Sequence, residues 1–346
     1  MRPGARRYRR VLLVLSVALV GSALLAVSVG AVAISPGSVV RLVVWKLGLG
    51  PRPNVSRAAE VIVFQLRLPR VALAMVVGLA LAVAGTLFQG LFRNPLADPA
   101  IIGVSSGAAL GAIAVIVLGG GTVLGGLGVS AAAFVGGLLT AFFVYRLARV
   151  GPAVNVATLL LAGIAVAAVI SAAMSLFMSF AGEEIRSIYF WLLGGLSSRG
   201  WTAIEIVAPL ALLGVVGTVA LVRDLNLMSL GEERAAQLGV DTARFKRRAV
   251  ALGALLAGAA VSVSGVIGFV GLMTPHVMRL IVGSDHRRLL PAVLLAGPTF
   301  LVLADLVSRV VLAPQELPLG AVTALIGGPF FLVLLRRERR RASAVA

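Results

Sequence analysis

Long apolar stretches, separated by short polar turns, follow one another along almost the entire chain. A helix that crosses the hydrocarbon core of a bilayer needs about 20 apolar residues, and nine stretches reach or approach that length. Only 13% of the residues are charged, against about 25% in a soluble domain. The sequence therefore predicts an all-α, polytopic membrane helical bundle. The stretches are 11–34, 71–92, 100–118, 122–145, 153–180, 206–222, 249–273, 289–312 and 317–335.

Small residues recur at helical spacing on both sides of a polar turn, Arg93-Asn94-Pro95-Leu96-Ala97-Asp98-Pro99. Residues four apart lie on one face of a helix, and small residues there let membrane helices approach closely. The pattern predicts a tightly packed bundle and does not by itself indicate transport. The residues are Ala74, Gly78 and Ala82 before the turn, and Gly103, Gly107 and Gly111 after it.

Arginine clusters at both ends of the chain set the expected topology. The formal net charge is +18, and most basic residues flank apolar runs, so we interpret them as topology signals and not as a nucleic-acid-binding surface. Because both ends are basic, both are expected in the cytoplasm, and the number of crossings must be even. A short tenth element is expected around Pro275–Val282, interrupted by Thr274-Pro275-His276. An interrupted helix at membrane depth is tolerated where it lines a cavity, which makes this segment a candidate for the transport path.

The N-terminus admits two interpretations. A basic start followed by an apolar run and Ala31-Val32-Ala33 resembles a signal peptide with a cleavage site. The apolar run, however, is longer than the roughly 7–15 residues of a signal sequence, which favours a retained first membrane helix. The chain contains no cysteine, which excludes disulfides and thiolate metal sites.

Residues suited to catalysis or to proton coupling are scarce. His276 and His286 are the two histidines, and we expect no metal site. Asp305 is the exceptional acidic residue inside a predicted crossing, and Arg309 follows it at a spacing that favours a local ion pair. No GxxxxGK[ST] phosphate-binding loop occurs, and the two lysines are Lys46 and Lys246. If ATP drives transport, the ATPase must therefore be a separate chain.

A polar segment between two predicted crossings, 224–245, carries the pattern of a short surface helix. Residues Glu232 to Leu238 have helix-forming composition, and Gly239 suits the left-handed position that ends a helix. Exposed charges beside a small apolar side, Ala235 and Leu238, are typical of a docking element for another protein. An ordinary solvated loop helix remains the alternative.

Several motifs together resemble the FecCD-type permease subunits of bacterial ABC importers, which carry ferric siderophores, haem or cobalamin. The match spans roughly residues 60–335. The resemblance implies ten membrane helices per subunit, both termini cytoplasmic, and a homodimer with the path on its two-fold axis. The matching pieces are Leu66-Arg67-Leu68-Pro69-Arg70, Gln89 to Pro99 continuing through Ser105-Ser106-Gly107-Ala108, the loop Leu230–Val240, Gly268 to His276, Asp285-His286-Arg287, and Glu316-Leu317-Pro318-Leu319-Gly320.

The resemblance also implies partners and residue roles. Two ABC ATPase subunits would bind ATP and Mg²⁺ on the cytoplasmic face, and a substrate-binding protein would deliver the metal chelate from outside. No cofactor is expected on this chain. Arg67, Arg70 and Arg309 match arginines that dock the binding protein, and Asn155 and Thr158 fall near the family's inner gate. The ATPase-coupling residues would be Leu230, Gly231, Glu232, Glu233, Arg234, Ala235, Ala236, Gln237, Leu238 and Gly239.

The sequence thus predicts one transmembrane permease domain, 1–346, in the bacterial cytoplasmic membrane. It would comprise a membrane bundle (11–335), a coupling loop (224–245) and a basic tail (336–346), with Pro275 and His276 as further path candidates. The expected function is ATP-driven import of an iron chelate or cobalamin. An ion-coupled secondary transporter that works without an ATPase, and a channel or structural scaffold, are the alternatives from other classes.

Overall fold

The computed structural model describes residues 3–120, 127–150, 153–197 and 199–343. Seven described helices are long and apolar enough to cross a membrane, and three shorter apolar helices accompany them. The first residues of the predicted 122–145 crossing and the last of the 336–346 tail lie outside the described residues. A two-residue antiparallel pair, β1 (Arg149–Val150) with β2 (Ala153–Val154), is the exception to the all-α prediction.

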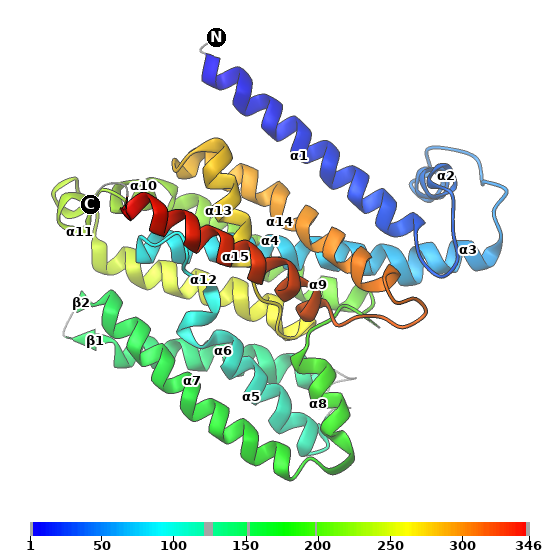
Figure 1. The fold of residues 1–346 in the computed structure, drawn as a ribbon. Helices are drawn as coiled ribbons and strands as arrows, with labels where there is room; N and C mark the ends of the chain where they lie inside the picture. The colour runs from blue at the N-terminus through cyan, green and yellow to red at the C-terminus, as the bar shows by residue number, and fades with distance from the viewer. Residues whose placement is uncertain (1–2, 121–126, 151–152, 198, 344–346) are drawn as a thin grey trace.

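The helices form an elongated bundle with α4 (Leu68–Phe92), α12 (Thr242–Ser264) and α14 (His286–Val310) at its centre. Figure 1 shows α1 along one side of this centre and α5 to α8 along the other. The remaining long helices are α1 (Pro3–Ser28), α5 (Val104–Val117), α6 (Gly128–Leu147), α7 (Val156–Ser179), α9 (Trp201–Ala220), α13 (Val270–Val282) and α15 (Leu319–Ser343).

Short helices occupy the connections. Two of them, α2 (Pro36–Lys46) and α3 (Arg57–Val61), lie in the connection between the predicted crossings 11–34 and 71–92. A π-helical turn, Ile62–Arg67, joins α3 to α4, so that one helical span runs from Arg57 to Phe92. The predicted start at residue 71 was therefore too late. The others are Pro99–Ile102 (3-10), Gly182–Glu184 (3-10), α8 (Ile185–Leu192), α10 (Val222–Met228) and α11 (Glu232–Gln237).

Glycines at the predicted positions allow the closest helix contacts. A Cβ on Gly78 would overlap the backbone of Gly297 on α14, and one on Gly107 would overlap Thr140 and Gly136 on α6. Because no Cβ intervenes, the backbones meet directly, as the small-residue pattern predicts. Gly103 differs from the rest of its series, since it has φ +78° and forms the N-terminal cap of α5.

The interruption predicted next to the short element Pro275–Val282 lies at a different place from the one that the sequence suggests. The helix α13 continues through Thr274-Pro275-His276, and the interruption is the extended segment Gly265–Phe269 between α12 and α13. Pro275 has no N–H, so the Gly271 carbonyl lacks its usual intrahelical partner. That carbonyl instead faces Gly85 on α4, where a Cβ would overlap it. The helix tolerates this proline because a neighbouring helix covers the freed backbone group.

Both ends of the chain lie toward the end of the bundle that carries α10 and α11 (Figure 1). The Tyr8 hydroxyl donates to the carbonyl of Arg288, which places the start of α1 beside the start of α14. Near its C-terminal end, α1 also contacts α14, since the Arg309 guanidinium donates to the Ala26 carbonyl at 2.9 Å. The first helix therefore packs lengthwise on the bundle.

Candidate functional site: two polar ends of the bundle and an outer cavity

The predicted coupling loop forms a short, well-defined helix at one end of the bundle. We call α10, α11 and their connection the coupling segment (222–239). The predicted glycine cap is confirmed: Gly239 has φ +84°, its N–H donates to Ala236, and the Val240 N–H donates to Ala235. These two bonds satisfy the last carbonyls of α11 and end the helix sharply.

One face of α11 is anchored to the bundle and the other faces outward. Ala235 is fully buried, and Glu232 accepts a 2.5 Å bond from the buried ammonium of Lys246 on α12. Glu233, Arg234, Ala236 and Gln237 are exposed, and so are Leu230 and Leu238. Leu238 lies on the exposed side, contrary to the apolar side expected with Ala235. An anchored helix with an exposed mixture of leucine and charge is suited to binding another protein.

Polar bonds tie the coupling segment to the start of α14. The Asn226 amide donates to Asp285 at 2.7 Å, and its carbonyl oxygen accepts the backbone N–H of His286 at 2.8 Å. Asp285 also caps α14 by accepting the Arg287 N–H, and this bond and the Asn226 bond hold its pKa below the ordinary value. These hydrogen bonds link α10 directly to the first turn of α14.

At the opposite end, which we call the outer end, three of the predicted residues join a buried ionic cluster. Asp305, with 1% of its side chain exposed, accepts bonds from Arg70 at 2.9 Å and from Arg309 at 3.1 Å. Arg70 reaches a second carboxylate, Glu316, at 2.8 Å, and the Ser197 hydroxyl donates to Glu316 at 2.6 Å. Burial alone would raise the pKa of Glu316, but the bonds from Arg70 and Ser197 lower it on balance.

The third predicted docking residue, Arg67, lies beside this cluster but bonds to backbone. Its guanidinium donates to the carbonyls of Val27, Ser28 and Val32 at 2.5–3.0 Å, and only 8% of the residue is exposed. It therefore satisfies the carbonyls left at the C-terminal end of α1. The predicted arginines thus share one end of the bundle, but all three turn inward.

The predicted gate and path residues lie apart from one another. Asn155 caps α7, accepting the N–H of Ala157 at 2.8 Å, and Thr158 lies in the first turn of that helix. His276 is buried in α13 with its ring edge-to-face against Phe330 of α15, and Pro275 is buried beside it. These positions show local structural roles, and their part in gating stays a prediction. Among the described residues, no group of three His, Asp or Glu side chains could hold a metal ion.

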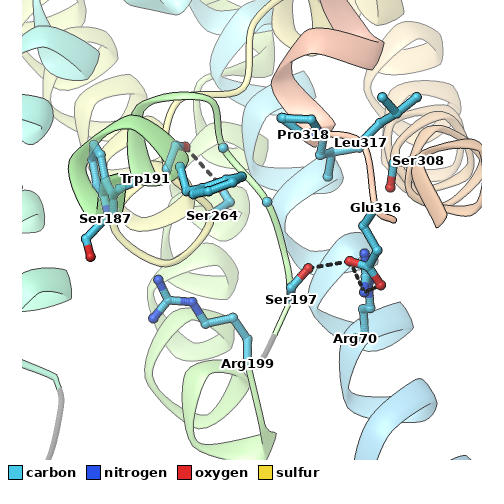
Figure 2. Close-up of a pocket in the computed structure, with 15 residues that line it drawn as sticks. Arg70, Ser187, Trp191, Ser197, Arg199, Ser264, Ser308, Glu316, Leu317 and Pro318 are labelled. Atoms are coloured by element: carbon cyan, nitrogen blue, oxygen red, sulfur yellow. Dashed lines mark hydrogen bonds and ion pairs between the residues drawn. The ribbon is translucent and has the colours of Figure 1, made fainter. Parts of the chain in front are cut away.

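A cavity of about 440 Å³ opens between α8, residues 194–197 and 199, the end of α12 and the start of α15. We call it the outer cavity. Arg70 and Glu316 form part of one wall, and Arg199 lies on another (Figure 2). The remaining lining residues are Ser187, Phe190, Trp191, Gly194, Gly195, Ser197, Ser264, Gly265, Ser308, Leu317, Pro318 and Leu319.

Comparison with known proteins decides the family. The FecCD transport family matches residues 12–337, nearly the whole chain. The chain belongs to the FecCD transport family. It is therefore a multi-pass membrane protein of a family of ABC importer permease subunits, and the resemblance carried by its motifs is confirmed.

Individual FecCD relatives differ in the cargo that their names give. The chain is 47% identical over 84% of its length to the cobalamin import system permease BtuC of Halobacterium salinarum, covering 77% of that protein. It is 44% identical over 80% of its length to the hemin transport permease HmuU of Yersinia pestis, covering 84% of that protein. A solved structure described as an inward-facing conformation of a metal-chelate type ABC transporter superposes with a TM-score of 0.83 at 33% identity, covering 95% of this chain and 99% of that one.

Several polar residues of this FecCD protein are ones that sequence reasoning missed. Asn226 and Ser197 bind their partners across 59 and 119 residues of sequence, and no local pattern marks such contacts. Arg199 left a weak signal, because it is an arginine in a short Gly- and Ser-containing turn between two apolar helices. Glu316 stood inside one of the matching motifs but carried no assigned role.

Proposed function

We propose that this chain is the permease subunit of an ATP-driven importer for a metal chelate, either an iron chelate (ferric siderophore or haem) or cobalamin. The observation that carries the proposal is the coupling segment, a helix fixed to the bundle on one face and exposed on the other. Membership of the FecCD family supports the same assignment. ATP and Mg²⁺ would be bound by two partner ATPase subunits that grip this segment.

The bonds around the coupling segment provide a route for the power stroke. ATP must bind one arrangement of the complex better than the other to shift the equilibrium between outward-open and inward-open states. Movement of α11 would pass through α10 and Asn226 to Asp285 at the start of α14. The helix α14 then leads to Asp305, 20 residues on and so roughly 30 Å away at 1.5 Å per residue. A single helix thereby connects the ATPase side with the outer end.

A ten-crossing topology with both termini in the cytoplasm fits the set of apolar helices. The seven long apolar helices and the three shorter ones of the described chain would supply the crossings. Both chain ends lie toward the coupling segment, and positive charge near membrane segments favours the cytoplasmic side. The protein would reside in the cytoplasmic membrane of the cell.

A homodimer would cover the least buried long helix near the outer cavity. In the most apolar part of α7, 22% of the residues are buried, against 78% in the span that contains α4. The exposed face of α7 carries large apolar side chains, such as Leu161, Val169 and Leu176, interspersed with small and hydroxyl residues that would let a helix of a second copy approach closely. The small and hydroxyl residues are Ala168, Ser171, Ala172, Ser175 and Ser179.

The ionic cluster would orient an extracytoplasmic binding protein. Arg70 and Arg309 pair with Asp305 and Glu316, and Arg67 lies beside them with its guanidinium on backbone carbonyls, so this end carries an excess of positive charge. A positive field attracts acidic side chains and speeds encounter more than it adds affinity. We expect the association rate of the binding protein to fall steeply with added salt.

Reconstitution tests the proposal. Liposomes would carry this chain with its cognate ATPase and binding protein, and uptake of hemin and of cyanocobalamin would be followed. Uptake of one of them that requires ATP and stops with a hydrolysis-dead ATPase supports the importer. Uptake that persists with the dead ATPase, or with this chain alone, would instead indicate an ion-coupled transporter.

A further inference from the structure

The outer cavity holds one arginine whose charge the protein does not balance. Arg70 is already paired with Asp305 and Glu316, and Ser197 completes the Glu316 contacts. Arg199 makes no ion pair and no hydrogen bond with any described residue. Figure 2 shows its guanidinium directed toward Ser187 and Trp191, away from the Arg70–Glu316 pair. The cavity therefore carries a net positive charge located at Arg199.

Placing a guanidinium in this position is costly without an anion. Arg199 is partly buried, and burial lowers its pKa, yet an arginine remains protonated near neutral pH. A buried charge without a partner is strongly unfavourable, and proteins normally pair it. Such unbalanced groups at a cavity wall mark sites where a ligand supplies the missing partner.

The walls of the cavity indicate the class of that ligand. A guanidinium binds a carboxylate through two parallel N–H···O bonds, a geometry that an ammonium or a hydroxyl cannot reproduce. Phe190 and Trp191 add aromatic surface, and the Ser187 hydroxyl lies on the same side as Arg199. The volume of about 440 Å³ falls in the range of small-molecule sites. These features suit an aromatic or aliphatic body with an acidic substituent.

We propose that the outer cavity is a subsite for a chelate that bears carboxylate groups, and that Arg199 pairs with one of those carboxylates as the cargo enters. The inference rests on the proposed importer function and narrows its cargo. An acidic side chain of the binding protein is the competing occupant. The partly buried position of Arg199 on the cavity wall favours a small ligand that enters the cavity.

The experiment uses the complete reconstituted importer with three variants. Arg199→Gln removes the charge, and Arg199→Lys keeps it without the planar guanidinium. Arg57→Gln, an exposed arginine on α3 that does not line the cavity, is the matched control. The probes are hemin, which carries two propionate carboxylates, and cyanocobalamin, whose corrin side chains are amides. Because hydrogen bonds to charged groups stabilise strongly, Arg199→Gln should raise the apparent KM for hemin roughly tenfold or more. The KM of Arg199→Lys should lie between those of Arg199→Gln and the parent, and the KM of Arg57→Gln should equal that of the parent.

Two further measurements separate this role from a structural one. Without cargo, Arg199→Gln should melt at the same or a higher temperature than the parent, because it removes an unpaired buried charge. The affinity for the unloaded binding protein should not change. A lowered melting temperature, or weaker docking of the empty binding protein, would overturn the proposal in favour of a structural or a docking arginine.

Comparing the two cargoes completes the test. ATP-dependent uptake of hemin in the parent, with a selective defect in Arg199→Gln, supports the subsite. ATP-dependent uptake of cyanocobalamin alone, or a hemin KM that Arg199→Gln leaves unchanged, overturns the subsite while the importer function stands. Absence of ATP-dependent uptake of hemin, of cyanocobalamin and of a ferric siderophore counts against the proposed function and removes the subsite with it.

Discussion

The two polar ends of the bundle use charge in opposite ways. At the outer end, Asp305, Arg70 and Arg309 are turned inward and satisfied by one another. At the coupling end, Glu233 and Arg234 of α11 point outward, and Lys246 and Asn226 hold the segment from behind. Buried and paired charge fixes the relative position of helices, whereas exposed charge is available to a partner. The charges at the outer end therefore hold α1, α4 and α14 together, whereas those at the coupling end are exposed on a surface suited to binding another protein.

The centre of the molecule explains how the two ends can act together. The backbones of α4, α13 and α14 meet at glycines, so neither side chains nor lipid intervene between them. Close-packed interiors transmit displacement because they have few voids to absorb it. A shift imposed at Asp285 is thus carried along α14 toward Asp305.

Breaking the outer cluster should have the largest effect on stability. Asp305→Ala leaves Arg309 without a carboxylate partner, with 8% of its side chain exposed, and leaves Arg70 with Glu316 alone. Removing one partner of a buried pair typically costs about 3–5 kcal/mol. Thermal unfolding in detergent should show a correspondingly lower melting temperature, with Asp305→Asn as a second variant of the same shape.

The exposed pair between Arg52 and Glu60 provides the contrast. Arg52 has 65% of its side chain exposed, so Arg52→Ala should change the free energy of unfolding by less than about 1 kcal/mol. Equal melting temperatures for Asp305→Ala and Arg52→Ala would show that the outer cluster does not hold the helices together.

Obstructing the glycine contacts should have the next largest effect. A methyl group at Gly85 would overlap the Gly271 carbonyl that Pro275 leaves free, so Gly85→Ala must push α4 and α13 apart. Overpacking of this kind costs about 1–3 kcal/mol. Gly21→Ala in α1 is the control, since nothing lies within 4 Å of that position. An unchanged melting temperature for Gly85→Ala would contradict the close contact.

Hydropathy and charge predicted most of the fold because each crossing is marked locally by a run of apolar residues between polar or charged ones. They misplaced the break near Pro275, since proline usually interrupts a helix and only tertiary contact with Gly85 shows that the freed carbonyl is covered. They also predicted Arg67 and Arg70 on the side of the membrane opposite to the coupling segment, and the structure places both at the opposite end of the bundle, but the sequence could not show that both turn inward. Asp305 binds Arg70 across 235 residues, and Arg67 binds the end of α1 across about 40, so neither contact has a local signature.

The sequence predicted the short helix α11 and its end, because a glycine cap depends only on its immediate neighbours. Gly239 was therefore predictable. The orientation of α11 was not, since it depends on Lys246 and on burial of Ala235 against the bundle. The unbalanced charge of Arg199 likewise appears only when the outer cavity is assembled from segments that lie far apart in the sequence.

An exposed change on the coupling segment should separate function from stability. Leu238 is 51% exposed, so Leu238→Asp should leave the free energy of unfolding within about 0.5 kcal/mol of the parent. If α11 is gripped by an ATPase, ATP-driven uptake should fall at least roughly tenfold, because a buried interface leucine is replaced by a charge. Normal uptake with normal stability would exclude this face as the ATPase contact. Ala236→Ser, on the same exposed face, is a mild control.

Acid should loosen the outer end by a smaller amount through Glu316. Its pKa lies below the ordinary 4.5, so its ion pair contributes fully above pH 4.5 and is lost as the pH falls through the lowered folded-state value. Because the side chain is 40% exposed, the contribution should be below about 1 kcal/mol. Melting curves between pH 6 and pH 3 should show Glu316→Gln less stable than the parent at the upper end and converging with it at the lower end. Ser197→Ala removes one of the bonds that lower this pKa, so in that background the melting temperatures with and without Glu316→Gln should converge closer to pH 4.5. A difference in melting temperature between Glu316→Gln and the parent that stays constant with pH would rule out the assignment.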